Sequence, residues 1–313
     1  MTAHQLASSA RIESEIPTPD HILSAAELSR FNPRSNRQGS LRLGGHLATI
    51  AISGYVWAMY PVAIPCLVIY GFSLAAMFAT MHECCHRTAF ANNQVNDAVA
   101  WWAGVLSFYN GTFYRRYHKW HHRYTRIPGK DPELTDRTPD SLYRYGLELT
   151  GLPWWWGKLR GHSRIALGIL DEYPYIPAPA SAEVIRSTRL QLLVYAIAIG
   201  VSIGFAQPWF VMYWLLPLAV GQPLLRFVLL AEHTGCTLDD NSLTNTRTTL
   251  TWAPLRYLMW NMPFHAEHHL HPSIPFHALP AAHERLKSHF RTVDPGYVRV
   301  NLGIISKLES RWS

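Results

Sequence analysis

Two long runs of the chain are apolar, and a turn interrupts each run near its middle. The first run, about 43–81, has no Asp, Glu, Lys or Arg and is divided at Pro61. The second, about 190–231, carries Arg226 as its only charge and turns near Pro208. About 20 apolar residues cross a bilayer as a helix, so each run has the length of two spans. The pattern predicts an all-α membrane protein with four transmembrane helices arranged as two hairpins.

The segments outside the hairpins are polar. Residues 82–189 and 232–287 lie between and after the hairpins, and we expect them to form one helical cap. Tails are predicted at 1–42 and 288–313. The first tail lacks an apolar core that could serve as a signal peptide, so we expect the chain to start in the cytoplasm.

The basic residues test this topology. The chain has 313 residues, 48% of them apolar and only 16% charged, with a net charge of +7. Of the Lys and Arg residues, 5 precede residue 43, 14 lie between 82 and 189, and 8 follow 231, but neither predicted outer turn has one. By the positive-inside rule, the cap and both termini are cytoplasmic. A basic membrane-facing surface explains the charge without nucleic acid; a deeply buried soluble helical core is the alternative.

The four cysteines do not form a disulfide framework. Cys66, Cys84, Cys85 and Cys236 show no regular spacing, and two of them are adjacent. We therefore expect reduced thiols on the cytosolic side. Cys84 and Cys85 turn away from the helix face shared by the histidines beside them, so packing is the favoured role for both.

Histidines are concentrated in a few short motifs. On a helix, positions i, i+3 and i+4 share a face, so each motif can direct its imidazoles toward one point. Each motif lies at the inner end of a predicted span or in the cap, so all of them emerge on one side of the bilayer. The candidate ligands are His82 and His86 in HECCH, His118, His121 and His122 in HKWHH, His233 in AEH, and His265, His268 and His269 in HAEHH.

The number of imidazoles predicts the type of site. Eight or nine are too many for one ion, which takes four to six ligands, but they suit two ions. Imidazole binds Zn, Cu, Fe and Ni, so spacing leaves the element open. We expect Glu267 and His271 to surround the ligands, and Arg226 either to support the site or a polar substrate group or to reach the lipid headgroups. His271, His277, His283 and His289 are expected at the surface or around the ligands.

One motif also fits a different enzyme. HECCH matches H-E-x-x-H, in which two histidines bind zinc and the glutamate, here Glu83, is the general base of a peptidase. That interpretation uses only His82 and His86 and leaves both H-x-x-H-H motifs unexplained.

Taken together, the motifs resemble the membrane-bound fatty acid desaturase family. The resemblance rests on H-x-x-x-H at His82, on the two H-x-x-H-H motifs, on AEHTG around His233 and on NTRTT from Asn245, and it covers about 43–287. It implies four spans and a cytosolic helical domain in which these histidines hold two non-haem iron ions. It further implies molecular oxygen as co-substrate. His271 departs from the family pattern, which usually has an aromatic or apolar residue there.

The resemblance also implies the partners. The substrate would be a lipid or another acyl chain reaching the site from the bilayer. Neither tail is large enough for a cytochrome domain, so we expect a separate electron donor, a ferredoxin or a cytochrome with its reductase. We predict a desaturase that introduces a carbon–carbon double bond. The alternatives are a hydroxylase or other oxidase on the same scaffold, acting on a lipid, a carotenoid or a small metabolite, and a non-catalytic membrane protein.

Overall fold

The computed structural model describes residues 22–137 and 139–310, and these residues are mostly helical. One short two-stranded parallel sheet accompanies the helices. The elements are α2 (Ala25–Phe31), α3 (Asn36–Met59), α4 (Ile64–Cys85), α5 (Asn93–Ser107), α6 (Gly111–Tyr124), α7 (Pro132–Arg137), α8 (Leu142–Leu149), α9 (Leu152–Ala166), α10 (Ala178–Gly204), the π-helix η2 (Val211–Leu215), α11 (Leu216–His233), β1 (Thr248–Leu250), α12 (Ala253–Leu258), α13 (His265–Leu270), α14 (Leu279–Leu286), β2 (Val293–Pro295) and α15 (Tyr297–Glu309).

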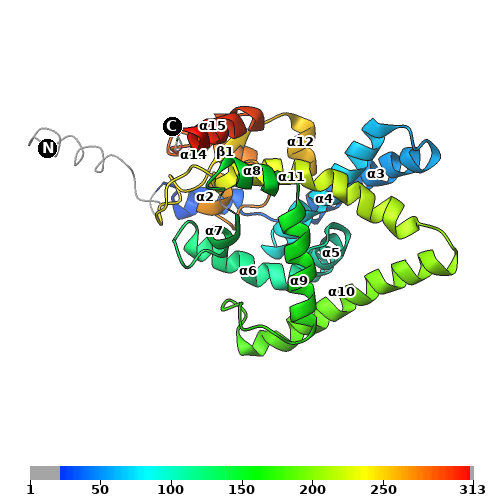
Figure 1. The fold of residues 1–313 in the computed structure, drawn as a ribbon. Coiled ribbons are helices and arrows are strands. Elements are labelled where there is room, and N and C mark those ends of the chain that lie inside the picture. Colours follow the sequence, from blue (N-terminus) through cyan, green and yellow to red (C-terminus); the bar gives the residue numbers. More distant parts are fainter. Residues whose placement is uncertain (1–21, 138, 311–313) are drawn as a thin grey trace, which may run out of the picture.

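Each of the two apolar runs folds as helices joined by a turn; α3 and α4 pack together, whereas α10 and α11 diverge from their turn (Figure 1). α3 and α4 form the first, and α10 with η2 and α11 forms the second; their turns project on the same side of the molecule, away from the part that holds α14 and α15 (Figure 1). The outward faces of these helices carry large apolar side chains such as Ile52, Ile197 and Ile203, which suits contact with lipid.

Three helices are long and apolar enough to cross a membrane. They are α4 with 22 residues, α10 with 27 residues, and η2 together with α11, which span 23 residues. α3 is not among them, because its first half carries Arg37, Arg42 and His46. The count of four spans therefore stays a prediction. α3 also begins seven residues before the apolar run, since Ser35 caps it by accepting a hydrogen bond from Gln38 N–H.

α4 and α11 pack against each other at the centre of the molecule, and two glycines allow the approach. A Cβ on Gly71 would overlap the carbonyl of Pro217, and a Cβ on Gly221 would overlap the carbonyl of Gly71. Ala75, Leu74, Leu218 and Leu225 lie in the apolar core that α4 shares with α11, and all four are buried. Because the two helices are fixed together, their C-terminal ends lie side by side, and these ends carry candidate ligands.

The remaining elements surround the two central helices α4 and α11. α5 and α6 pack on α4, and α8 and α15 pack on α11. β1 pairs in parallel with β2, Thr248 opposite Val293, which brings the chain before α13 next to α15. The chain after Lys287 thus contributes a packed helix, α15, whose Tyr297 and Ile304 are buried. Cys84 and Cys85 are both buried in the core, as their predicted packing role requires.

Candidate metal centre

The structure gathers all nine predicted ligands at one place in the cap. α4 ends with His82 and His86, α6 carries three histidines on its last two turns, α11 ends at His233, and α13 carries the last three. Asn110 starts α6 by accepting a hydrogen bond from Phe113 N–H, and packing against α4 and α5 orients the helix that carries these histidines.

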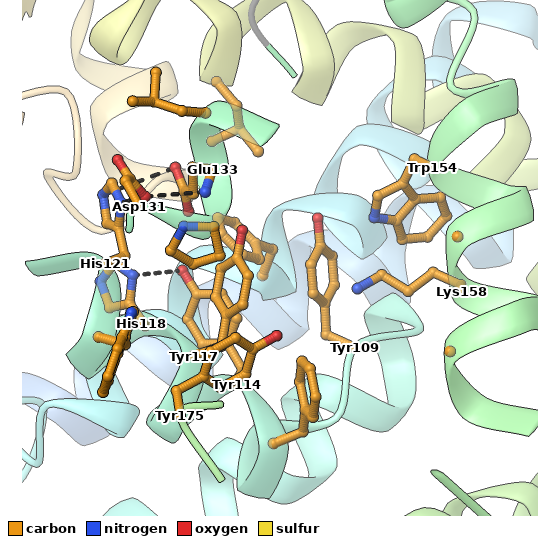
Figure 2. A pocket seen from close by; sticks show the side chains of 18 of the residues that line it. Tyr109, Tyr114, Tyr117, His118, His121, Asp131, Glu133, Trp154, Lys158 and Tyr175 are labelled. Carbon is orange, nitrogen blue, oxygen red and sulfur yellow. Dashed lines mark hydrogen bonds and ion pairs between the residues drawn. The ribbon is translucent and has the colours of Figure 1, made fainter. Parts of the chain in front are cut away.

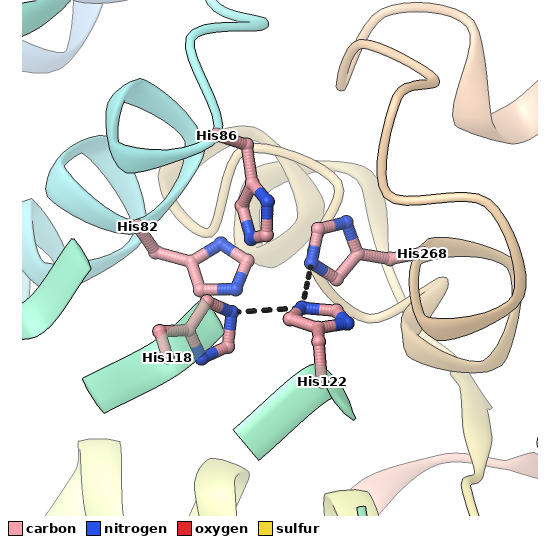
Figure 3. Close-up of side chains that lie close together, drawn as sticks. All are labelled: His82, His86, His118, His122 and His268. Carbon is pink, nitrogen blue, oxygen red and sulfur yellow. Dashed lines mark hydrogen bonds between the residues drawn. The ribbon is translucent and has the colours of Figure 1, made fainter. Parts of the chain in front are cut away.

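Eight of the nine histidines fall into two groups of ligating nitrogens, and His118 and His121 also form a third group with Glu133. Within each group the nitrogens lie within 4.8 Å of one another. The five-histidine group, drawn in Figure 3, consists of His82, His86, His118, His122 and His268. The three-histidine group consists of His121, His233 and His269.

His265 lies beside the three-histidine group. Its Nε2 is 3.1 Å from Nε2 of His233, and its ring centre is 4.5 Å from that of His269. Nine imidazoles therefore surround two neighbouring positions.

Each H-x-x-H-H motif contributes to both groups. His118 and His122, four residues apart, belong to the five-histidine group, whereas His121 belongs to the three-histidine group. In the last motif His268 and His269 are separated in the same way. Adjacent histidines of each motif therefore belong to different groups, although His118 and His121 also lie together in the group that includes Glu133. Successive residues on an α-helix point about 100° apart, so adjacent histidines face different positions.

The nitrogens of these rings lie at the distances that a shared metal ion requires. Nε2 of His122 is 3.0 Å from Nε2 of His118 and 3.1 Å from Nε2 of His268. One ring nitrogen has either a proton or a lone pair, so both contacts cannot be well-formed hydrogen bonds. Two nitrogens that each lie about 2.1 Å from one ion are about 3.0–3.5 Å apart, so the same distances fit co-ligation.

Several buried nitrogens of the cluster have no hydrogen-bond partner among the described residues. An unsatisfied buried polar atom costs about 1–3 kcal/mol, and a metal ion that accepts the lone pair removes that cost. The residues present therefore fit two metal ions. These atoms are Nε2 of His82, Nε2 of His86 and Nε2 of His269.

Hydrogen bonds to Nδ1 orient rings whose Nε2 faces a metal position. Nδ1 of His121 lies 2.9 Å from Oδ1 of Asp131, and Nδ1 of His118 lies 3.2 Å from the hydroxyl of Tyr114. His233 is held in the same way by the carbonyl of Asn245, 3.2 Å from Nδ1. Such contacts fix ring orientation and raise the basicity of a ligand.

Burial keeps most of the imidazoles neutral. It holds the pKa of His118, His122 and His268 well below the usual histidine range, and it lowers the pKa of His86 to about 3. Neutral imidazole is the metal-binding form, so these side chains are ready to coordinate at neutral pH. At His121, burial is outweighed by nearby carboxylates, and the pKa of that imidazole is raised.

Three carboxylates lie near the site, and the sequence analysis did not predict a role for them there. Asp131 is buried and also accepts from Arg126 N–H and Glu133 N–H. Glu133 Oε2 lies 3.7 Å from Nε2 of His121, and Glu232 Oε2 lies 3.5 Å from Nε2 of His265. No spacing rule marks Asp131, which follows His121 by ten residues along a loop.

The residues expected around the ligands have different roles. Glu267 is buried and does not face the ligand nitrogens; its two oxygens contact Nδ1 of His283 and the hydroxyl of Thr248, both at 2.5 Å. Glu267 thus ties α13 to α14 and β1. His283 is buried in this contact and not at the surface, because it is the partner of Glu267. His271, at the end of α13, is half-buried and belongs to neither group.

Arg226 faces a polar cavity. It is 2% exposed, and its Nη2 donates to the hydroxyl of Tyr109 at 2.7 Å. Because Arg226 is buried, its side chain does not reach the lipid headgroups, which was one of the roles expected for it.

The arrangement does not suit a zinc peptidase. Glu83, the general base of that interpretation, points its Oε1 at the backbone N–H of Phe276, 2.9 Å away. His82 and His86 share their position with three further histidines, which H-E-x-x-H does not use.

A pocket of about 850 Å³ leads to the histidines. Its lining includes His82, His118, His121, His233 and His265, so both groups border it. Figure 2 shows His118 and His121 with the carboxylates at one side and an aromatic region at the other.

Comparisons with known proteins find similarity to desaturases. Residues 55–301 match the family described as Fatty acid desaturase. The dihydrorhizobitoxine desaturase of Bradyrhizobium elkanii is 28% identical, in a match that covers 81% of this chain and 73% of the relative. The sn-1 oleoyl-lipid 12-desaturase of a Picosynechococcus species is 30% identical over 105 residues, which is 31% of this chain and 30% of the relative.

Proposed function

Because the chain belongs to the fatty acid desaturase family, we propose that it introduces a carbon–carbon double bond into the alkyl part of its substrate, using molecular oxygen and two iron ions. The observation that carries this proposal is the buried cluster of nine imidazoles around two neighbouring positions, with ring nitrogens that lack protein partners. An alkyl C–H bond gives an acid or a base nothing to act on, so the oxidising power must come from a bound metal centre.

The protein residues hold and shape this centre. The five-histidine and three-histidine groups would bind one iron ion each, with His265 beside the second. Bound iron supplies the oxidising chemistry. Asp131, Tyr114 and the carbonyl of Asn245 keep ligand rings oriented, so the positions are formed before any ion binds. The buried setting limits water at the reacting carbon atoms.

The overall reaction fixes what else is needed. Two hydrogen atoms leave neighbouring carbons of the substrate, and one oxygen molecule takes them together with two further electrons and two protons, giving a double bond and two water molecules. An external donor must supply those two electrons; we propose a ferredoxin or a cytochrome with its reductase.

The reaction can be tested by giving candidate substrates to iron-loaded protein together with a matched electron donor. The experiment uses oxygen labelled with ¹⁸O and mass spectrometry of the products. A product two mass units lighter and free of label is expected. A product that retains one labelled oxygen atom would instead assign a hydroxylase on the same scaffold.

We also propose that both hairpins cross the membrane, with α3 as the fourth span, and that the metal centre and both termini are cytoplasmic. α3 has 24 residues, about 36 Å of helix, and pairs with α4 along the first hairpin. The absence of Lys and Arg from both hairpin turns supports the orientation. Reporter fusions after Thr188 and after Arg311 should both report the cytoplasm; an external signal at either one contradicts the topology.

A further inference from the structure

α9 has an outward face that is apolar along its first two turns. Leu152, Trp156 and Leu159 recur at helical spacing, so they share one face, and they are 62%, 68% and 63% exposed. Lys158, the only charged residue from 152 to 159, points away from this face, with Nζ 3.9 Å from the ring centre of Tyr109. We call the three exposed side chains the α9 patch. An exposed apolar patch of this kind marks a surface that contacts lipid or another protein.

The first end of α9 lies at the level of the candidate membrane spans. The ring of Trp155 is 5.4 Å from that of Phe108, which stacks on Tyr195 of α10 at 4.3 Å. A Cβ on Gly151, just before α9, would lie 3.3 Å from Cβ of Gln222 on α11. Gln222 lies about 16 Å of helix before the end of α11. α9 therefore meets α11 within the candidate span and not beyond its C-terminal end.

The other end of α9 adjoins the start of the second apolar run. Nε of Arg189 donates to the carbonyl of Ala166, the last residue of α9, at 2.8 Å. Leu167, which follows α9, is exposed, and so are Leu190 and Leu193 on α10. The outward apolar surface of α9 therefore continues onto the outward face of α10, for which we propose contact with lipid.

The charged side chains of α9 that face outward lie along one edge of the helix. Arg160 pairs with Glu172 at 2.7 Å, and Arg164 pairs with Asp171 at 2.9 Å. Figure 1 shows α9 running across the direction of α11, so α9 lies roughly along the membrane plane if α11 crosses the membrane. A helix with an apolar face, charges at its edge and this orientation is typical of the membrane interface.

We propose that α9 lies in the cytoplasmic interface of the bilayer, with the α9 patch in contact with lipid acyl chains. The inference rests on the proposed topology, in which α10 and α11 cross the membrane. The depth of α9 along α11 and the continuity of its apolar surface with α10 favour lipid over a partner protein. Pro153, Trp156 and Gly157 also line the pocket at the metal centre, so this contact places one wall of the pocket beside the bilayer.

Thiol accessibility in a nanodisc that holds one iron-loaded chain tests the inference. Leu159→Cys, Leu302→Cys and Ile197→Cys are compared, because the native side chains are 63%, 59% and 56% exposed. Leu302 is the matched control, since it lies on α15 between exposed Arg299 and Ser306. A water-soluble maleimide reaches both faces of a nanodisc, and peptide mass spectrometry reads each position separately from the native cysteines.

Leu159→Cys should react about tenfold or more slowly than Leu302→Cys, and about as slowly as Ile197→Cys on α10. The reason is that the thiolate is the reactive form and apolar surroundings disfavour it, by about tenfold for each unit by which the pKa rises. Equal rates at Leu159→Cys and Leu302→Cys, whether fast or slow, would overturn the inference. With one chain in each nanodisc, neither a second copy nor a soluble partner can cover the patch.

The position on α10 separates this failure from failure of the proposed topology. Fast reaction of Leu159→Cys with slow reaction of Ile197→Cys would overturn the inference and keep the topology, whereas fast reaction at both would contradict the topology as well. Neither result depends on double-bond formation, so the proposed reaction stands or falls separately.

A second measurement uses the unaltered chain and decides the question should Leu159→Cys fail to fold. A hydrophobic diazirine dissolved in the nanodisc bilayer labels the side chains that touch lipid when it is illuminated. Labels should appear in peptides from α9 and α10 but not from α15. Label on α10 without label on α9 would overturn the inference.

Discussion

The five-histidine group and the three-histidine group adjoin each other, but their surroundings differ. Imidazoles alone make up the first group. The second is bordered by Asp131 on Nδ1 of His121, by Glu133 at 3.7 Å from Nε2 of the same ring, and by Glu232 near His265. The pKa of His121 is raised, whereas burial lowers the pKa of His122 next to it. Two positions built from the same motifs thus differ in charge.

The difference suggests how the two positions divide their work. Five neutral nitrogens can nearly complete the shell of one ion, whereas three histidines need His265 and further donors. Nearby carboxylates compensate for the missing nitrogens by offsetting the positive charge of an ion. We therefore expect the three-histidine position to be the more easily emptied of the two.

Removal of one ligand from each group should produce the largest effect. We expect about two iron ions per chain in the unaltered protein and no turnover in either His121→Ala or His268→Ala. His121→Ala should lose more iron, because it removes one of three ligands and not one of five. Elemental analysis of purified protein measures both. His289→Ala, which belongs to neither group, is the control. Equal iron loss in the two ligand variants would contradict the comparison.

Asp131→Asn should have an intermediate effect. The amide keeps the shape but not the charge that raises the basicity of His121. Loss of such an orienting carboxylate weakens metal binding by about 10–100-fold. Competition with a chelator should show one iron ion released early while the other stays. Asp140→Asn, an exposed position, is the matched control. Release of both ions together would show that the positions are not independent.

Glu133→Gln should have the smallest effect. The carboxylate side chain is 27% exposed, so solvent screens its attraction for a nearby ion. We expect weaker binding of the second ion by about fivefold or less, read from the same chelator competition. Full retention of affinity would mean that Glu133 does not act on the ion, and a loss as large as that of Asp131→Asn would make it a direct ligand.

The spacing of residues within short segments of the sequence was sufficient to predict much of the fold. The prolines that break the apolar runs marked both hairpin turns, since proline ends a helix by its missing N–H. The close spacing of the histidines marked eight members of the cluster, and the ninth, His233, was marked by its place at the end of the second apolar run. Both features depend on residues within a few positions of each other. Over that distance, helix geometry alone determines which side chains lie close together.

Contacts between distant segments were decided only by the tertiary structure. His121 and His122 are adjacent in sequence but face different positions, because the rotation of α6 is fixed by its packing. Glu267 meets His283 through a turn that no spacing rule describes. Lys158 on α9 and Arg226 on α11 both contact Tyr109 and Trp154. The sequence by itself thus determined which histidines are candidate metal ligands, whereas their division into groups and the carboxylates beside them depend on how the helices pack.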